Sequence, residues 1–309
     1  MAFKPLNPRR IAVAFAALAA GYVVIMFPLG CARSIADRLL LHPSTDERAT
    51  YGANERWVDA PTGRVQVFTA GSPSAMGVEP ERYVLRVMGN ASRAEREATP
   101  IAARWGDVPT EVWCANYPGF GRSEGVARVG SLVPAVEAVW EAMGEEADGR
   151  PMYLDVDSMG SAVGLSIAAS RKADLPAAGI VVKNPPPLRP LILERFGWWN
   201  LWLVAGPVAL SVPAELDSIE NAKQLHVPAV FIRATADGLI PPSFQERISD
   251  AYAGRKRVVL LDGADHATEL TEDEEHSIRR AIDAMTRGFR ENADEGDAPV
   301  AGGAGMVRP

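Results

Sequence analysis

The sequence predicts an α/β protein, with a mostly parallel twisted sheet of about eight strands, helices on both faces and an inserted helical cap. Short β-branched or apolar runs alternate with longer segments of helical period, which is the pattern of strand–helix–strand units. Residues that carry chemistry stand directly after several of these runs, where parallel strands present their carboxyl ends. With 309 residues, 47% hydrophobic and 23% charged, the chain is long enough for one such domain.

The expected strands are the short apolar runs, which cover Arg64 to Ala70, Tyr83 to Met88, Glu111 to Tyr117, Met152 to Val156, Gly179 to Lys183, Ala229 to Ala234 and Arg257 to Leu261. The expected helices lie between them, over Ala94 to Trp105, Leu132 to Met143, Ser161 to Ala169, Phe244 to Ala253 and Glu272 to Phe289. Strands that are joined by such crossovers run parallel, with both faces of the sheet covered. Ligands then bind at the carboxyl ends of the strands.

One stretch interrupts this alternation. Asn184 to Leu216 contains three consecutive prolines, followed by Phe196, Trp198, Trp199 and Trp202. We expect residues 184–216 to form a cap over the functional site. The alternative is that these aromatic side chains form the core of an ordinary helix, because a cap also needs a core.

The N-terminus has the order of charged and apolar residues that is typical of a signal peptide or signal anchor. Three basic residues precede an apolar stretch from Ile11 to Gly30, which is followed by Cys31. A length of about 20 residues suits a membrane-spanning helix better than the core of a signal peptide. We therefore expect residues 1–31 to attach the protein to a membrane. Basic residues ahead of the stretch favour a cytoplasmic N-terminus, which puts the catalytic domain on the periplasmic or extracytoplasmic side.

Two other interpretations of this segment remain open. The tripeptide Leu29-Gly30-Cys31 resembles the cleavage site of bacterial lipoproteins, in which the cysteine is lipidated, although Pro28 stands where that motif prefers leucine. The segment is otherwise a buried N-terminal helix of a soluble protein. Residues 32–291 are expected to form the α/β domain. Residues 292–309, rich in Gly, Ala and Asp, are expected to be a disordered tail.

Composition argues against several classes of function. The net charge is −7 and there is no extended basic block, so nucleic acid is not an expected partner. Only two cysteines occur, Cys31 and Cys114, which argues against a disulfide framework. The four histidines show no close His/Cys spacing of the kind that metal sites use. No metal and no cofactor is expected.

Ser158 is the candidate nucleophile. It stands in Tyr153 to Ala162, a strand that runs into a tight turn and then into a helix of small residues. This is the context of a G-x-S-x-G nucleophile elbow, in which the helix N-terminus faces the developing anion. Val156 stands at the position of the first glycine of the pattern. A bulkier residue is tolerable there if the helix packs slightly further from the strand. Small neighbours such as Gly160 are needed where the helix crosses the strand.

A serine hydroxyl needs a histidine to take its proton and an acid to orient that histidine. Asp237 directly follows one expected strand and His266 directly follows the next, in the order serine, acid, histidine. The alternatives are a turn residue for Asp237 and an exposed loop residue for His266. Asp262 and Asp265 are rival acids, but residues so close to the histidine in a loop rarely aim a carboxylate at its ring.

The remaining histidines, His42, His226 and His276, are interpreted as structural or surface residues. An oxyanion would need two backbone N–H donors. One comes from Met159, the residue after the serine. The other comes from Asn90, in the loop Met88-Gly89-Asn90-Ala91 that follows the expected strand Tyr83 to Met88.

At this point the residues resemble a known group. From about Arg64 to Ile282 the chain resembles the α/β-hydrolase superfamily, in particular its membrane-anchored abhydrolase-domain branch, which is related to serine peptidases of the prolyl-oligopeptidase clan. The matching pieces are Gly89-Asn90-Ala91, Tyr117-Pro118-Gly119-Phe120-Gly121-Arg122-Ser123, Asp157-Ser158-Met159-Gly160-Ser161, Asp237-Gly238-Leu239-Ile240-Pro241 and His266.

The resemblance implies a catalytic triad of Ser158, Asp237 and His266 with an oxyanion hole near Asn90 and Met159. It also implies that the Tyr117 to Ser123 turn is a structural loop beside the site. Two positions depart from the family pattern: Met88 replaces a histidine, and Val156 replaces the first elbow glycine.

The leading hypothesis is therefore a serine hydrolase that cleaves an ester or related acyl bond through an acyl-enzyme on Ser158. An aromatic cap next to a membrane anchor suggests a small-molecule acyl substrate that is lipid-like. Cleavage of amides or peptides is the alternative within enzymes. A catalytically silent, membrane-tethered binding protein is the alternative from another class, because fold does not imply function.

Overall fold

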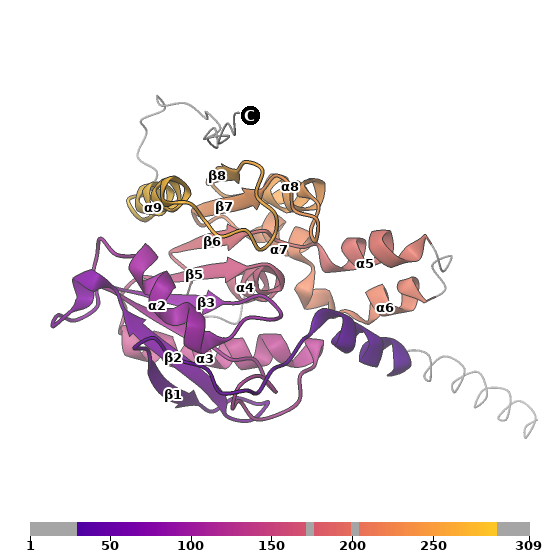
Figure 1. The fold of residues 1–309 in the computed structure, drawn as a ribbon, viewed down its shortest axis with the longest axis horizontal. Helices are drawn as coiled ribbons and strands as arrows, with labels where there is room; N and C mark the ends of the chain where they lie inside the picture. Colours follow the sequence, from indigo (N-terminus) through magenta and orange to yellow (C-terminus); the bar gives the residue numbers. More distant parts are fainter. Residues whose placement is uncertain (1–29, 171–175, 199–203, 289–309) are drawn as a thin grey trace, which may run out of the picture.

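Eight strands form one twisted sheet in the part of the chain that the computed structural model describes, which is residues 30–170, 176–198 and 204–288 (Figure 1). They are β1 (Asn54–Val58), β2 (Val65–Gly71), β3 (Arg82–Val87), β4 (Thr110–Ala115), β5 (Met152–Asp157), β6 (Gly179–Lys183), β7 (Ala229–Ala234) and β8 (Lys256–Leu261). Their order across the sheet is β1-β2-β4-β3-β5-β6-β7-β8. Only β2 runs against the other seven. The predicted mostly parallel sheet is thus confirmed.

Helices cover both faces of this sheet (Figure 1). One face carries α2 (Ala94–Arg104) and α9 (Glu272–Thr286); the other carries α3 (Leu132–Ala147), α4 (Met159–Ala169), α7 (Ser218–Gln224) and α8 (Pro242–Ala251). Side chains along a strand alternate between these layers: Leu154 and Val156 of β5 join the core under α3 and α4, whereas Tyr153 joins the core under α2 and α9. Short 3₁₀ turns occur at Pro73–Ala75, Val129–Ser131 and Ala214–Leu216.

β1 and α7 are among the elements absent from the sequence-based prediction. β1 is an edge strand with a mostly exposed, polar sequence, paired only with β2, so it lacks the alternation that marks a half-buried strand. α7 is a helix of 7 residues whose start is capped by Asp217, the side chain of which accepts from the backbone N–H groups of Ile219 and Glu220. Neither element has a strong hydrophobic period of its own.

The stretch predicted as a cap contains two helices, α5 (Leu188–Gly197) and α6 (Ala205–Ser211), which pack against each other (Figure 1). Its side chains divide between the interior and the surface. Leu188, Ile192 and Val208 are buried, whereas Trp198 and Leu210 are 75% and 74% exposed. Trp199 and Trp202 lie outside the described residues.

Residues 30–40 form a helix ahead of β1 that packs through Ala32 and Ala36, while Cys31 is exposed. None of the helices in the described ranges is long and apolar enough to cross a membrane. The apolar stretch before residue 30 and the tail 292–309 lie outside the described residues, so the predictions made for them stay predictions.

Candidate active site

Ser158 lies in a sharp turn between β5 and α4, with φ 52° and ψ −128°. Residues other than glycine rarely adopt this backbone conformation, and such strain concentrates at functional sites. The Ser158 N–H donates to the carbonyl of Lys183 at the end of β6, at 2.9 Å, which holds the turn against the neighbouring strand. A Cβ on Gly160 would lie 2.2 Å from the carbonyl oxygen of Val87, so only glycine fits two residues after the serine.

The structure also shows where Val156 finds room. A Cβ on Gly164, one helical turn beyond Gly160, would lie 2.3 Å from Cγ1 of Val156. The glycine that the elbow pattern usually places on the strand is thus replaced by a valine on the strand and a glycine on the facing helix. The departure from the motif is accommodated by packing within the elbow.

Ser158, His266 and Asp237 meet at the carboxyl ends of three strands. His266 Nε2 lies 3.1 Å from Ser158 Oγ, and His266 Nδ1 lies 2.7 Å from Asp237 Oδ2. The Asp237 side chain is fully buried and that of His266 is 19% exposed. The structure therefore brings together the three side chains that the sequence singled out, in the hydrogen-bonded order that a serine nucleophile requires.

Asp237 is held by more than the imidazole. Its Oδ1 accepts from the N–H groups of Leu239 and Ile240, at 2.9 and 2.7 Å. Its Oδ2 accepts from Gln245 Nε2 at 2.9 Å, in addition to His266. Gln245 lies in the first turns of α8 and is completely buried. Sequence reasoning missed it, because a single glutamine eight residues beyond the acid carries no motif.

The rival acids, Asp265 and Asp262, bind groups other than the imidazole. Asp265 Oδ1 accepts from the backbone N–H of Gly238 at 2.8 Å and of His266 at 2.7 Å, so it joins the two loops that carry the acid and the base. These bonds hold the pKa of the Asp265 carboxyl below its usual value. Asp262 lies 3.3 Å from the Thr235 hydroxyl. Neither carboxylate contacts the imidazole ring.

The loop after β3 lies against the serine. A Cβ on Gly89 would be 3.4 Å from Ser158 Cβ and 3.8 Å from its Oγ. Among the hydrogen bonds of the described residues, none uses the backbone N–H of Asn90 as a donor. Met159 is the first residue of α4, so its N–H belongs to the unpaired donors of a helix N-terminus. Of the two predicted oxyanion donors, Met159 directly follows Ser158 in the sequence, and Asn90 directly follows Gly89, which lies against the serine.

Met88, one of the two positions that depart from the predicted pattern, is completely buried among the side chains beneath α2 and α9. Its carbonyl accepts from the Tyr117 hydroxyl at 2.7 Å. Tyr117 begins the predicted structural turn, and burial raises the pKa of its phenol far above the ordinary value, so it remains a donor. The side chain at position 88 thus serves the core, while its backbone connects the loop to the turn.

A group of charged residues lies beneath the serine. Asp157, directly before Ser158, accepts from Arg86 at 3.1 Å and lies 3.9 Å from Lys183. Burial acts to raise the pKa of Asp157, but the attraction of Lys183, Arg86 and His266 outweighs it, and the pKa is lowered. Asp157 therefore carries its negative charge near the base at neutral pH.

The predicted cap contacts the loop that carries the acid. Arg195 of α5 donates to the carbonyls of Gly238 and Leu239, both at 3.2 Å. These carbonyls follow Asp237 directly. α5 is therefore attached to the loop that carries Asp237 as well as to the core.

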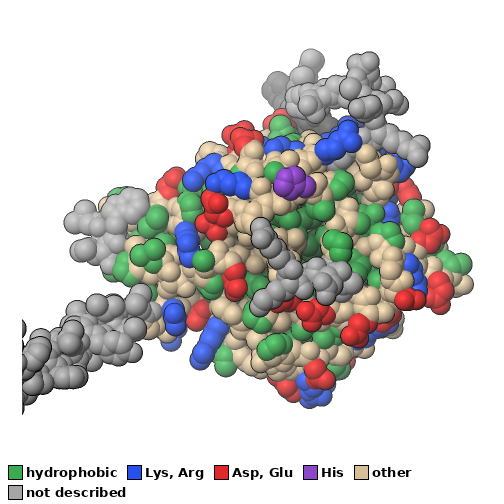
Figure 2. All heavy atoms as spheres, turned by 180° about the vertical axis from the view of Figure 1, so that it is seen from behind, with side chains coloured by type: hydrophobic (Ala, Val, Ile, Leu, Met, Phe, Trp, Pro, Cys, Tyr) green, Lys and Arg blue, Asp and Glu red, His purple; other side chains and the backbone are tan. Residues whose placement is uncertain are grey.

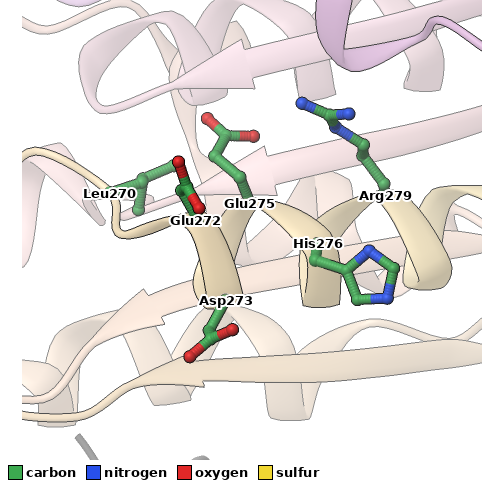
Figure 3. A pocket seen from close by; sticks show the side chains of 6 residues that line it. All are labelled: Leu270, Glu272, Asp273, Glu275, His276 and Arg279. Atoms are coloured by element: carbon green, nitrogen blue, oxygen red, sulfur yellow. The ribbon is translucent and has the colours of Figure 1, made fainter. Parts of the chain in front are cut away.

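The other histidines are spread over the molecule. His226 Nδ1 lies 3.1 Å from the Gln224 carbonyl, and His276 lines a hollow of about 490 Å³ on α9. Figure 3 shows the side chains of this hollow, which are Leu270, Glu272, Asp273, Glu275, His276 and Arg279; none belongs to the site at Ser158. No cluster of His, Cys, Asp or Glu in the described ranges could hold a metal ion. On the coloured part of the face in Figure 2, acidic and basic side chains are interspersed.

Comparison with known proteins gives few relatives by sequence and many by fold. No family model matches the chain. An uncharacterized protein of Mycobacterium tuberculosis, present in strains H37Rv and CDC 1551 / Oshkosh, is 26% identical over 213 residues, which cover 68% of this chain and 70% of that protein.

Three solved structures illustrate the similarity of fold. The esterase Pf2001 of Pyrococcus furiosus has a TM-score of 0.59 at 13% identity, over 80% of this chain and 97% of that one. Est1E of Butyrivibrio proteoclasticus, solved with bound ferulic acid, has a TM-score of 0.60 at 13% identity, over 75% and 99%. An alpha-beta hydrolase of Vibrio vulnificus has a TM-score of 0.58 at 18% identity, over 76% and 81%.

Proposed function

We infer that this chain, which has the α/β-hydrolase fold, is a serine hydrolase that cleaves an ester or related acyl bond. The observation that carries the proposal is the chain of hydrogen bonds from Asp237 through His266 to Ser158, with the serine on a strained turn. Hydrolases and esterases among the structures of similar fold support it. Substrate cleavage is not required by the fold, so the proposal depends on the geometry of these three residues.

The proposed reaction proceeds in two halves. Ser158 Oγ attacks the carbonyl carbon while His266 Nε2 takes the hydroxyl proton, and His266 returns that proton to the departing alcohol. Water then attacks the acyl-enzyme, giving up a proton to His266, which passes it to the Ser158 oxygen as the acid leaves. Asp237 holds the Nδ1–H tautomer through both halves. The N–H groups of Asn90 and Met159 would stabilise the oxyanion, and losing one such donor costs about 100-fold or more in rate.

The surroundings of the site support a proposal for the substrate class. Trp198, Val204 and Leu210 expose apolar surface on the helices of the predicted cap, which contact the Asp237 loop through Arg195. The uncharged stretch Ile11 to Gly30 reaches the first of the described residues. We propose a membrane-tethered enzyme, with its catalytic domain on the periplasmic or extracytoplasmic side, that takes acyl-chain or lipid-like substrates.

A fluorophosphonate probe tests the central proposal, since Ser158 Oγ would displace fluoride from phosphorus and become covalently labelled. The purified wild-type chain should be labelled and Ser158→Ala should not, while Ser161→Ala, three residues further along α4, should be labelled like the wild type. Absence of Ser158-dependent labelling would identify the silent binding protein instead.

With p-nitrophenyl esters of increasing chain length, kcat/KM should rise with length; a strong preference for acetyl esters would refute the lipid-like substrate.

A further inference from the structure

Residues 41–46, which connect the helix of residues 30–40 to the rest of the domain, cross over the loop that follows β3; we call them the N-terminal strap. His42 makes two hydrogen bonds to Asn90. Its backbone N–H donates to the Asn90 carbonyl at 3.3 Å, and its Nδ1 lies 3.1 Å from Asn90 Nδ2. Asn90 Nδ2 can only donate, so His42 Nδ1 is the acceptor. The ring is then the neutral tautomer with its proton on Nε2.

The strap is also attached at a second point. The Ser44 carbonyl accepts from Arg93 Nη1 at 2.7 Å and from the Gly121 N–H at 2.9 Å. Arg93 ends the loop of residues 88–93 after β3, which we call the oxyanion loop, and is only 2% exposed. Gly121 belongs to the Tyr117 to Ser123 turn. The strap therefore contacts both the loop after β3 and the Tyr117 to Ser123 turn.

The oxyanion loop is held at its two ends by other groups. Tyr117 binds the Met88 carbonyl at the start, and Asn116 Oδ1 accepts from the Ala94 N–H at 2.9 Å at the end. Between these points lies Asn90. Among the described residues, its side chain and its carbonyl have hydrogen bonds to His42 and to no other residue.

We propose that His42 is a positioning residue for the oxyanion hole; this inference rests on the proposed function. The bonds to His42 hold both the Asn90 side chain and the Asn90 carbonyl, which are joined through the same Cα to the Asn90 N–H. They thereby restrict rotation of the Gly89–Asn90 peptide, which carries the proposed oxyanion donor. A donor contributes to catalysis only if it already points to the place where the negative charge develops.

Burial does not explain this contact. His42 is exposed, so it contributes little to the core, and the adjacent Leu41 is the strap residue that packs into it. The side-chain bond between His42 and Asn90 joins residues that are 48 positions apart in the sequence.

The test compares His42→Ala, His42→Asn and Asn90→Ala in the full chain, with His276→Ala as the control for loss of an exposed histidine. The readouts are the second-order rate of fluorophosphonate inactivation, kcat and KM for a p-nitrophenyl ester, and thermal melting. His42→Ala should lower the inactivation rate and kcat about 3- to 10-fold with KM and melting temperature nearly unchanged, the size of one neutral hydrogen bond.

His42→Asn offers its side-chain oxygen near the place of Nδ1 and should recover most of this rate. Asn90→Ala should resemble His42→Ala, and the double variant should be no slower than either. Wild-type rates in His42→Ala, or equal rates in His42→Ala and His42→Asn, would overturn the proposal. If His42→Ala does not fold, the inactivation rate and kcat of Asn90→Ala, compared with those of the wild type, decide the matter: wild-type values would overturn the proposal. Absence of labelling in the wild type would instead refute the proposed function itself.

Discussion

The charge of Asp237 is satisfied almost entirely by neighbours that also fix its direction. Two backbone N–H groups bind one carboxylate oxygen, while Gln245 and His266 share the other. A carboxylate that is bound in this way cannot rotate, so the imidazole it orients keeps Nε2 toward Ser158. Gln245 acts on the reaction only through Asp237 and is therefore a positioning residue.

Gln245→Met removes the Nε2 donor while keeping the length of the side chain. Because hydrogen bonds to charged groups contribute about 1.5–3 kcal/mol, we expect kcat to fall at least tenfold with KM little changed. Steady-state kinetics on a p-nitrophenyl ester would measure this. Gln224→Met, at the exposed end of α7, is the matched control and should keep wild-type kcat. A larger effect on KM than on kcat would contradict the assigned role.

At the scale of elements, β5 and α4 approach each other closely enough that side chains must be matched in size across the crossing. Gly160 gives room to the backbone of β3, and Gly164 gives room to Val156. The tight crossing brings the N-terminus of α4 beside Ser158, where its positive end favours a developing anion. The packing of the elbow is thus directly connected to its electrostatics.

A double-mutant cycle tests this match. Gly164→Ala should destabilise the protein by about 1–3 kcal/mol, since its new Cβ would overlap Val156 Cγ1. In a Val156→Ala background the same substitution should cost much less, giving a coupling of about 1 kcal/mol or more. Gly206→Ala in α6 is the control, because nothing lies within 4 Å of its Cβ position. Chemical denaturation measures the free energy of unfolding of the two single variants, the double variant and the control. Additive effects of Gly164→Ala and Val156→Ala would show that the two side chains do not touch.

For the whole molecule, Arg86 is the cation that joins separate parts of the domain beneath the site. From β3 it binds Asp155 and Asp157 of β5, at 2.8 and 3.1 Å, and Glu97 of α2 at 3.1 Å. Its side chain is only 4% exposed. Paired in this way, buried charges are tolerated, but removal of one partner leaves the others uncompensated.

Arg86→Met should therefore cost about 3–5 kcal/mol of unfolding free energy at pH 7. In the wild type the lowered pKa of Asp157 contributes stability that is present above about pH 4 and is lost as the pH falls further. Without Arg86, the burial that acts to raise the pKa of Asp157 is opposed less strongly, so Asp157 takes up its proton at a higher pH and the deficit should shrink by pH 4.5.

Urea denaturation of both proteins at pH 7 and pH 4.5 measures this change. Arg64→Met, which breaks the exposed pair with Glu124, is the control and should cost less than about 1 kcal/mol at either pH. A deficit for Arg86→Met that is equal at the two pH values would show that the carboxylates are not held by this arginine.

The sequence by itself determined the parallel sheet and the places of Ser158, Asp237 and His266. Strand, turn and helix patterns are local, and right-handed crossovers bring the carboxyl ends of successive strands to one edge. A residue that directly follows a strand can therefore be placed near the site without coordinates. β1 was not predicted, because an exposed edge strand lacks the buried apolar face that produces an alternating pattern.

Only the tertiary structure decided what surrounds these three residues. Gln245 reaches Asp237 because α8 folds back over the loop, His42 reaches Asn90 across 48 positions, and Arg86 reaches Asp155 across 69. Such contacts depend on the relative placement of elements, and sequence periodicity reports only which face of one element is buried. The residues that perform the proposed chemistry were therefore predictable from the sequence, whereas the residues that hold them in position were not.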